Sequence, residues 1–137
     1  MKQDALTNFL PTSVKWGLRL VAAVILGQTL FFKFTAAPES IYIFTRIGME
    51  PLGRVGSGMM ELVATILLLW PAYSAVGALL AMAVMSVALA MHLTLLGIVV
   101  QEDHGLLFGL ACTVWVSSVL IFLDGRKQIP WIGSKLP

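Results

Sequence analysis

Charged residues are scarce in this sequence. Asp, Glu, Lys and Arg make up 12% of its 137 residues, and 58% of the residues are hydrophobic. Soluble domains typically carry ~25% charged residues, so this composition predicts an integral membrane protein whose main partner is the lipid bilayer. The length suits a single domain. The formal net charge of +2 gives no basis for binding nucleic acid.

The sequence also lacks the common cofactor and redox motifs. A single cysteine, Cys112, excludes an internal disulfide and a dithiol pair within one chain. Only two histidines occur, and His104 lies outside the expected spans, so haem ligation by two histidines is not expected. There is no HExxH motif and no Walker loop. The adjacent Glu102, Asp103 and His104 fit a solvated turn better than a metal site, because metal sites usually draw on separated ligands.

Long apolar segments fill most of the chain. A helix that spans a bilayer needs about 20 mostly apolar residues. Four candidate spans cover residues 14–35, 54–72, 74–100 and 105–123. The turn at Pro71 is so short that the second and third spans must form an antiparallel helical hairpin. The sequence therefore predicts an all-α fold, a polytopic membrane four-helix bundle, with residues 1–137 as a single transmembrane domain.

The only long connection, residues 36–53, has a helical pattern of its own. Ile41, Phe44 and Ile47 recur at helical spacing, and Glu39 suits the first turn of a helix. This pattern predicts a short amphipathic helix over Glu39–Ile47 that lies at the membrane interface or over the bundle.

The distribution of basic residues predicts an orientation. Four spans put both termini on one side of the membrane, together with Lys2, Lys15, Arg19, Arg126, Lys127 and Lys135. Only Lys33, Arg46 and Arg54 fall on the other side. Because cytoplasmic flanks carry more Lys and Arg, we expect both termini in the cytoplasm and the long connection outside. A bacterial cytoplasmic (inner) membrane fits such a chain.

Polar residues inside the expected spans mark the candidate site. Glu61 lies in the middle of an apolar stretch, and ionisable groups inside membrane helices are rare and usually functional. Counting ~1.5 Å per helical residue puts Glu61, Lys33 and His92 at similar depth in the outer half of the membrane, with Gln28 about one turn deeper than Lys33. One hypothesis is a polar pocket for a quinone headgroup, a lipid headgroup or a small anion. The alternative is a buried hydrogen-bonded network that only fixes helix packing.

Two arginines near the outer end of the bundle extend the candidate site. Arg46 and Arg54 can bind phosphate or carboxylate groups, because arginine forms bidentate contacts with them. Anchoring at the membrane interface explains them at least as well.

Several short motifs, in a fixed order, resemble the DoxX family of small four-helix membrane proteins. These motifs are Arg19-Leu20, Lys33-Phe34, the stretch GMMELVATILLL at 58–69, Ala90 with His92, and Leu123-Asp124. The resemblance implies the same four-helix fold. Some members of that family are similar to the small membrane subunit of an archaeal thiosulfate:quinone oxidoreductase, and others are linked to redox-stress complexes or to receptor assembly.

The resemblance favours a membrane accessory or anchor subunit of a redox system, with a quinone as the one cofactor worth considering. Such a chain works beside another protein subunit or as a homo-oligomer and is not expected to catalyse a reaction alone. The alternative is a membrane assembly or structural protein without a ligand. A transporter is less favoured, because the sequence has no obvious repeats or broken helices.

Overall fold

The computed structural model describes residues 9–129 and 133–137, and within these it is all-helical without strands. Lys2, which contributed to the predicted orientation, lies outside the described residues. The long helices are α2 (Thr12–Phe34), α4 (Leu52–Leu69), α5 (Ser74–Met91) and α6 (Leu106–Gly125). The short elements are the helix α3 (Pro38–Arg46), the π-helical turn η2 (His92–Leu96), and the 3-10 turns η1 (Pro71–Tyr73), η3 (Arg126–Gln128) and η4 (Gly133–Lys135).

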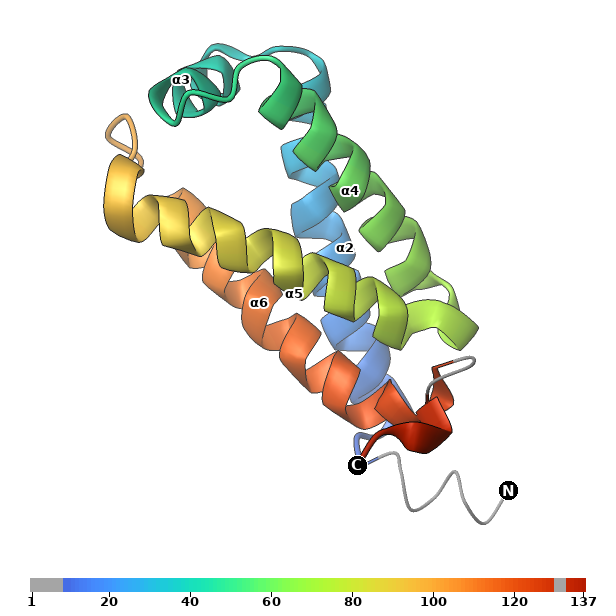
Figure 1. The fold of residues 1–137 in the computed structure, drawn as a ribbon. Helices are drawn as coiled ribbons and strands as arrows, with labels where there is room; N and C mark the ends of the chain where they lie inside the picture. Colours follow the sequence, from blue (N-terminus) through green and yellow to red (C-terminus); the bar gives the residue numbers. More distant parts are fainter. Residues whose placement is uncertain (1–8, 130–132) are drawn as a thin grey trace.

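Four of these helical segments are long and apolar enough to cross a membrane, which confirms the predicted multi-pass membrane bundle. In Figure 1 the helices α2, α4, α5 and α6 run alternately up and down between two ends of the molecule. Both α2 and α5 pack mainly against α4 and α6. Consequently α2 and α5 lie diagonally across the bundle, and the start of α2 and the C-terminus lie at the same end (Figure 1).

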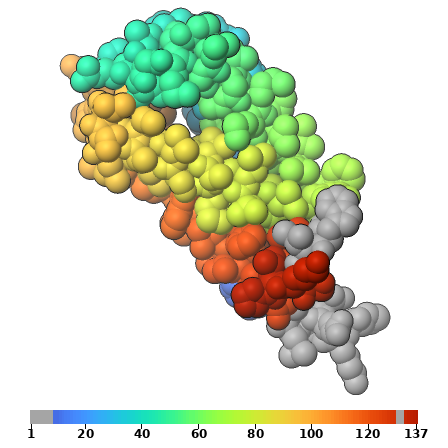
Figure 2. Space-filling model, viewed as in Figure 1, coloured from blue at the N-terminus to red at the C-terminus, as the bar shows by residue number. Residues whose placement is uncertain are grey.

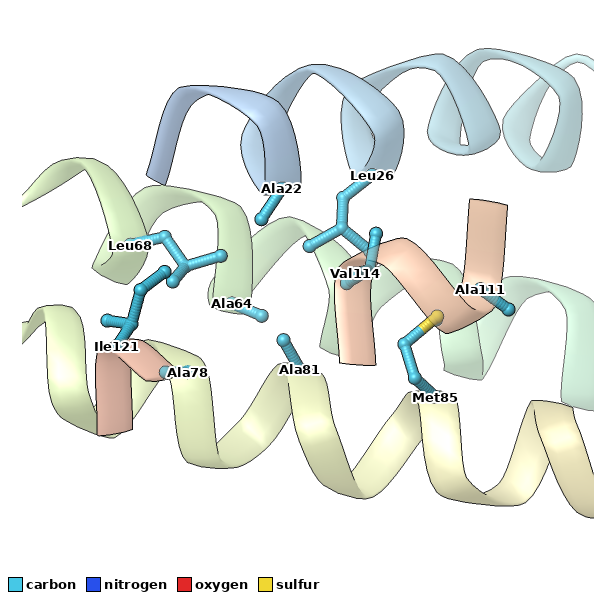
Figure 3. Packing of buried hydrophobic residues seen from close by; sticks show 10 residues of the cluster. All are labelled: Ala22, Leu26, Ala64, Leu68, Ala78, Ala81, Met85, Ala111, Val114 and Ile121. Atoms are coloured by element: carbon cyan, nitrogen blue, oxygen red, sulfur yellow. The ribbon is translucent and has the colours of Figure 1, made fainter. Parts of the chain in front are cut away.

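Small residues form much of the bundle core. The core cluster contains four alanines that are fully shielded from solvent, namely Ala22, Ala64, Ala78 and Ala81. Figure 3 shows the whole cluster: Ala22, Leu26, Ala64, Leu68, Ala78, Ala81, Met85, Ala111, Val114 and Ile121. In lipid, helices associate through such close backbone approach, because lipid tails are as apolar as the core. The outward faces are apolar as well, with exposed residues such as Val24, Val63 and Val87.

Gly77 makes the closest approach between α5 and α4. A Cβ atom at Gly77 would lie 2.6 Å from the backbone nitrogen of Leu68 and 2.8 Å from the Cβ of Leu67. Not every glycine of the long helices marks a close contact: at Gly56 an added Cβ would meet no atom of the described residues within 4 Å.

One predicted boundary is wrong by several residues. The third span was expected to reach residue 100, but the α-helical part of α5 ends at Met91 and the following π-helical turn ends at Leu96. Gly97 then has φ +81°, a conformation that ends a helix and that glycine adopts without strain. The apolar residues after this glycine hid the break, since Ile98, Val99 and Val100 have the composition of a continuing span.

The short helix α3 closes the end of the bundle opposite the C-terminus (Figure 1). Pro38 occupies its first turn, where its missing N–H group costs nothing, and Glu39 lies beside the positive end of the helix dipole. Ser40 and Phe44 are buried against the bundle. Phe44 thereby comes close to the ends of both α2 and α4.

Asp103 organises the loop between η2 and α6. Its Oδ1 accepts hydrogen bonds from the backbone N–H groups of Val100 (3.0 Å) and Gly105 (2.8 Å), and its Oδ2 accepts one from Leu107 (3.0 Å). These bonds hold a tight loop in which several residues have positive φ angles, namely Gln101, Glu102, His104 and Gly105. The carboxylate thus serves the start of α6, as acceptors near helix N-termini commonly do.

These contacts also set how Asp103 titrates. Partial burial raises the pKa of its carboxyl group. Hydrogen bonds from the backbone N–H groups of Val100, Leu107 and Gly105 lower this pKa, and so does the charge of His92. The lowering effects are larger together, so the pKa of Asp103 is below its ordinary value. A carboxyl group whose pKa is depressed by folding stabilises the folded state above the unfolded pKa of about 3.9. That contribution is lost as the pH falls through the folded pKa.

An Asp103→Asn variant is expected to be less stable at pH 7 by about 1 kcal/mol, the usual cost of losing a helix-end acceptor. Asparagine has one acceptor oxygen, so it cannot serve all three N–H groups. The difference in melting temperature between the variant and the wild type should shrink as the pH falls below about 4, because the Asp103 carboxylate of the unfolded chain is protonated there and that of the folded protein is protonated at a lower pH. The exposed neighbour Glu102→Gln is the control and should melt like the wild type throughout; a difference that persists unchanged at a pH of about 3 would contradict this account.

Candidate functional site

Helical periodicity brings polar residues of α2 and α4 to a shared face. Along α2, buried positions follow the i, i+3, i+4 rhythm from Arg19 through Leu26, and the same rhythm continues to Thr29 and Lys33. Along α4 it connects the buried Arg54 and Glu61. Since α2 and α4 pack against each other, these polar groups meet inside the bundle.

Lys33 and Glu61 form a buried ion pair. The Lys33 Nζ lies 2.5 Å from Glu61 Oε1, and the side chains are 14% and 2% exposed respectively. The Thr29 hydroxyl lies 3.0 Å from Glu61 Oε2 and 2.8 Å from the Leu26 carbonyl oxygen. Both carboxylate oxygens of Glu61 therefore have a partner, as a charge at this depth requires.

Arg54 joins the same cluster from the start of α4. Its Nη1 donates to the backbone carbonyl of Lys33, and its Nε lies 2.9 and 3.1 Å from the two carboxylate oxygens of Glu50. Lys33 lies in the last turn of α2, where carbonyl groups lack helical partners and a cation is favoured. The Phe44 ring of α3 covers this region, with its centroid 5.5 Å from Lys33 Nζ.

The remaining predicted site residues lie apart from this cluster. His92 is buried, but its Nδ1 lies 2.9 Å from the carbonyl oxygen of Gly97, and its ring makes an edge contact with Phe108. It thus stabilises the end of its own helix, and among the described contacts it has none with Lys33 or Glu61. Gln28 is exposed on the outer face of α2, and Arg46 is exposed on α3.

Sequence reasoning missed three members of the cluster. Thr29 lies one turn before Lys33, and its helical spacing from Lys33 was the signal for it. Glu50 lies four residues before Arg54, the spacing of an intrahelical ion pair. Phe44 carried no such signal, because its contact with Lys33 depends on how α3 folds back over α2 and α4.

The chemistry available to this cluster is binding and charge balance. An ammonium group has three donors, and among the described contacts Lys33 donates one hydrogen bond, to Glu61. The other two donors can serve an acceptor such as a quinone carbonyl or a phosphate oxygen. Figure 2 shows the surface hollowed where α3, α4 and the second half of α5 meet. Within residues 9–129 and 133–137, no group of three His, Cys, Asp or Glu side chains is placed to hold a metal ion.

Comparisons with known proteins identify no relative of this chain. No family model matches the chain, and neither a curated protein nor a solved structure is similar to it at a significant level. The resemblance to the DoxX family therefore stays a prediction from short motifs.

Proposed function

We propose that this chain is a DoxX-like membrane accessory or anchor subunit that works beside a redox partner and binds a quinone or lipid headgroup at Lys33. The observation that carries this proposal is the ion pair between Lys33 and the deeply buried Glu61 (2.5 Å). Glu61 holds the lysine in place, while the partial exposure of Lys33 leaves its ammonium group within reach of a headgroup from the end of the bundle. In this arrangement Arg54 fixes the end of α2, and α3 acts as a cover.

A second function, an assembly or structural protein without a ligand, is favoured by a different observation. Both oxygens of Glu61 already have partners within the chain, Lys33 and Thr29. A network that is complete without a ligand can be retained because it specifies one packing of the helices. The two functions differ in whether Lys33 contacts anything outside this chain.

A Lys33→Met/Glu61→Gln double variant separates the two functions, because it removes both charges together and leaves no unpaired ion. Each protein is purified gently from its own membranes and measured by native mass spectrometry, with extraction and identification of small molecules. We expect the wild type to carry a stoichiometric quinone or lipid and the double variant to have lost it. Glu39→Gln, an exposed change on α3, is the control and should retain the molecule.

Two outcomes would count against the headgroup hypothesis. If the wild type carries no small molecule, or if the double variant retains it at the same stoichiometry, Lys33 does not bind a headgroup. An empty wild-type chain that co-purifies with another protein would support the assembly function instead.

The proposed orientation places the end that carries the C-terminus in the cytoplasm of a bacterial inner membrane. Lys15, Arg126, Lys127 and Lys135 lie at that end, and cytoplasmic flanks are rich in Lys and Arg. At the other end, Lys33 and Arg54 are engaged in ion pairs and α3 lies in the outer connection. Green fluorescent protein fused after Pro137 tests this orientation, because the fusion fluoresces only if that end stays in the cytoplasm.

A further inference from the structure

Arg19 is buried at the end of the bundle that carries the C-terminus. A long basic side chain near a helix end can extend to the membrane interface, but Arg19 is only 5% exposed. It lies seven residues after Thr12, the first residue of α2, and hence ~10 Å along the helix. Burial of a charged group at this depth requires partners.

Arg19 has partners for only part of its guanidinium group. Its Nε donates to the carbonyl oxygen of Leu68 (2.5 Å), in the last turn of α4, where carbonyls lack helical partners. The guanidinium carbon lies 3.9 Å from the centroid of the Trp16 ring, which stacks against it. The Nη2 nitrogen is buried and has no hydrogen-bond partner among the residues that the structure describes. A buried donor without an acceptor is rare in folded proteins and calls for an explanation.

A pocket of about 210 Å³ lies beside this arginine. Its wall is formed by the start of α2, η1, the start of α5 and the end of α6, and includes Thr12, Lys15, Trp16, Arg19, Ser74 and Asp124. Lys15 and Asp124 form an ion pair at 3.3 Å, and Arg19 forms no ion pair within residues 9–129 and 133–137. The volume is below the ~300–1,000 Å³ of sites for drug-sized ligands, which suits a small charged group.

We propose that this pocket binds a phosphate group, with Arg19 as its principal ligand. The Ser74 hydroxyl, which donates to the Pro71 carbonyl oxygen (3.3 Å) in this structure, turns to the phosphate as a further donor. The planar guanidinium matches the oxygens of a phosphate and holds them by paired hydrogen bonds. The stacking on Trp16 and the bond to Leu68 fix its orientation in advance, while the phosphate supplies the missing acceptor for the guanidinium N–H groups. The phosphate belongs either to a lipid headgroup of the adjacent leaflet or to a free anion, since both present the same oxygens.

The test measures the apparent affinity of the full chain for two probes. Inorganic phosphate is titrated against the protein in a neutral detergent, and the melting temperature is followed. Separately, the protein is placed in nanodiscs of phosphatidylcholine with increasing phosphatidylglycerol. We expect saturable stabilisation of the wild type by at least one probe, and an apparent affinity at least tenfold weaker in Arg19→Gln. Lys127→Gln removes an exposed charge at the same end outside the pocket wall and should leave the affinity unchanged.

The probe that stabilises the wild type identifies the source of the phosphate group. A response to phosphatidylglycerol alone identifies a lipid headgroup, a response to phosphate alone identifies a free anion, and both responses support the site for either source. Stabilisation that is equal in the wild type and Arg19→Gln, or no response of the wild type to either probe, overturns the proposal. If Arg19→Gln does not fold, Arg19→Lys and Ser74→Ala replace it, because lysine keeps the charge but loses the paired geometry. A wild-type affinity in both replacements likewise overturns the proposal.

Discussion

A Lys33→Met variant is expected to lose about 3–5 kcal/mol of stability, the usual cost of removing one partner from a buried ion pair. The change leaves the Glu61 carboxylate, whose side chain is 2% exposed, without its cation. The reciprocal change, Glu61→Gln, should cost less. Lys33 is 14% exposed near the end of α2, and a lysine stem is long enough to bring its ammonium group to water. The free energy of unfolding in mixed micelles, by denaturant titration, measures both variants.

The Lys33→Met/Glu61→Gln double variant completes a thermodynamic cycle. Since replacing both members of a buried pair is often neutral, we expect this protein to be more stable than Lys33→Met alone. The coupling energy then isolates the pair from other effects of each change. A double variant whose loss of stability equals the sum of the two single losses would mean that the pair contributes nothing as a pair, and would undermine both functions considered for it.

A Gly77→Ala variant is expected to lose about 1–3 kcal/mol, the usual cost of adding a carbon to a tightly packed core. The new Cβ would meet the backbone of Leu68 at 2.6 Å, and backbone atoms cannot rotate away as a flexible side chain can. Helices α4 and α5 would have to separate. Thermal unfolding in detergent micelles measures the loss, and disulfide crosslinking between cysteines placed on α4 and α5 checks the separation.

Gly27→Ala is the matched control for this change. Gly27 also lies within a long helix, α2, but an added Cβ there meets no atom of the described part of the chain within 4 Å. Alanine has a higher helix propensity than glycine by up to about 1 kcal/mol, so this variant should be equal to the wild type or more stable. A similar loss in both variants would point to a general intolerance of alanine rather than to the contact at Gly77.

Composition and hydrophobic length were sufficient to predict the class of fold. Four apolar stretches in a chain of 137 residues have few arrangements other than a helical bundle, because lipid forces the backbone to satisfy its own hydrogen bonds. The end of α5 was predicted less well. Hydropathy reports how apolar a stretch is, and it does not register the positive φ of Gly97 when apolar residues follow.

The candidate site was predicted in part, for a similar reason. Depth along the helices correctly grouped Lys33 with Glu61, but depth alone says nothing about which way a side chain faces. Gln28 is adjacent in sequence to Thr29, yet a step of one residue turns it by about 100° and out of the bundle. His92 faces the interior, but it lies on the helix diagonally opposite α2 and bonds to Gly97 of its own chain segment. Such contacts depend on the packing of whole helices.

The two arginine contacts between α2 and α4 have a mechanical consequence for this pair of helices. At one end Arg54 of α4 bonds to the backbone of Lys33 in α2, and at the other Arg19 of α2 bonds to the backbone of Leu68 in α4. Arg19 and Lys33 are about 14 residues apart, or ~21 Å along the helix. Two bonds to backbone carbonyls, made in opposite directions at opposite ends, prevent either helix from sliding along the other. The two helices therefore keep one register along their shared length, and the close contact at Gly77 joins α5 to the same pair.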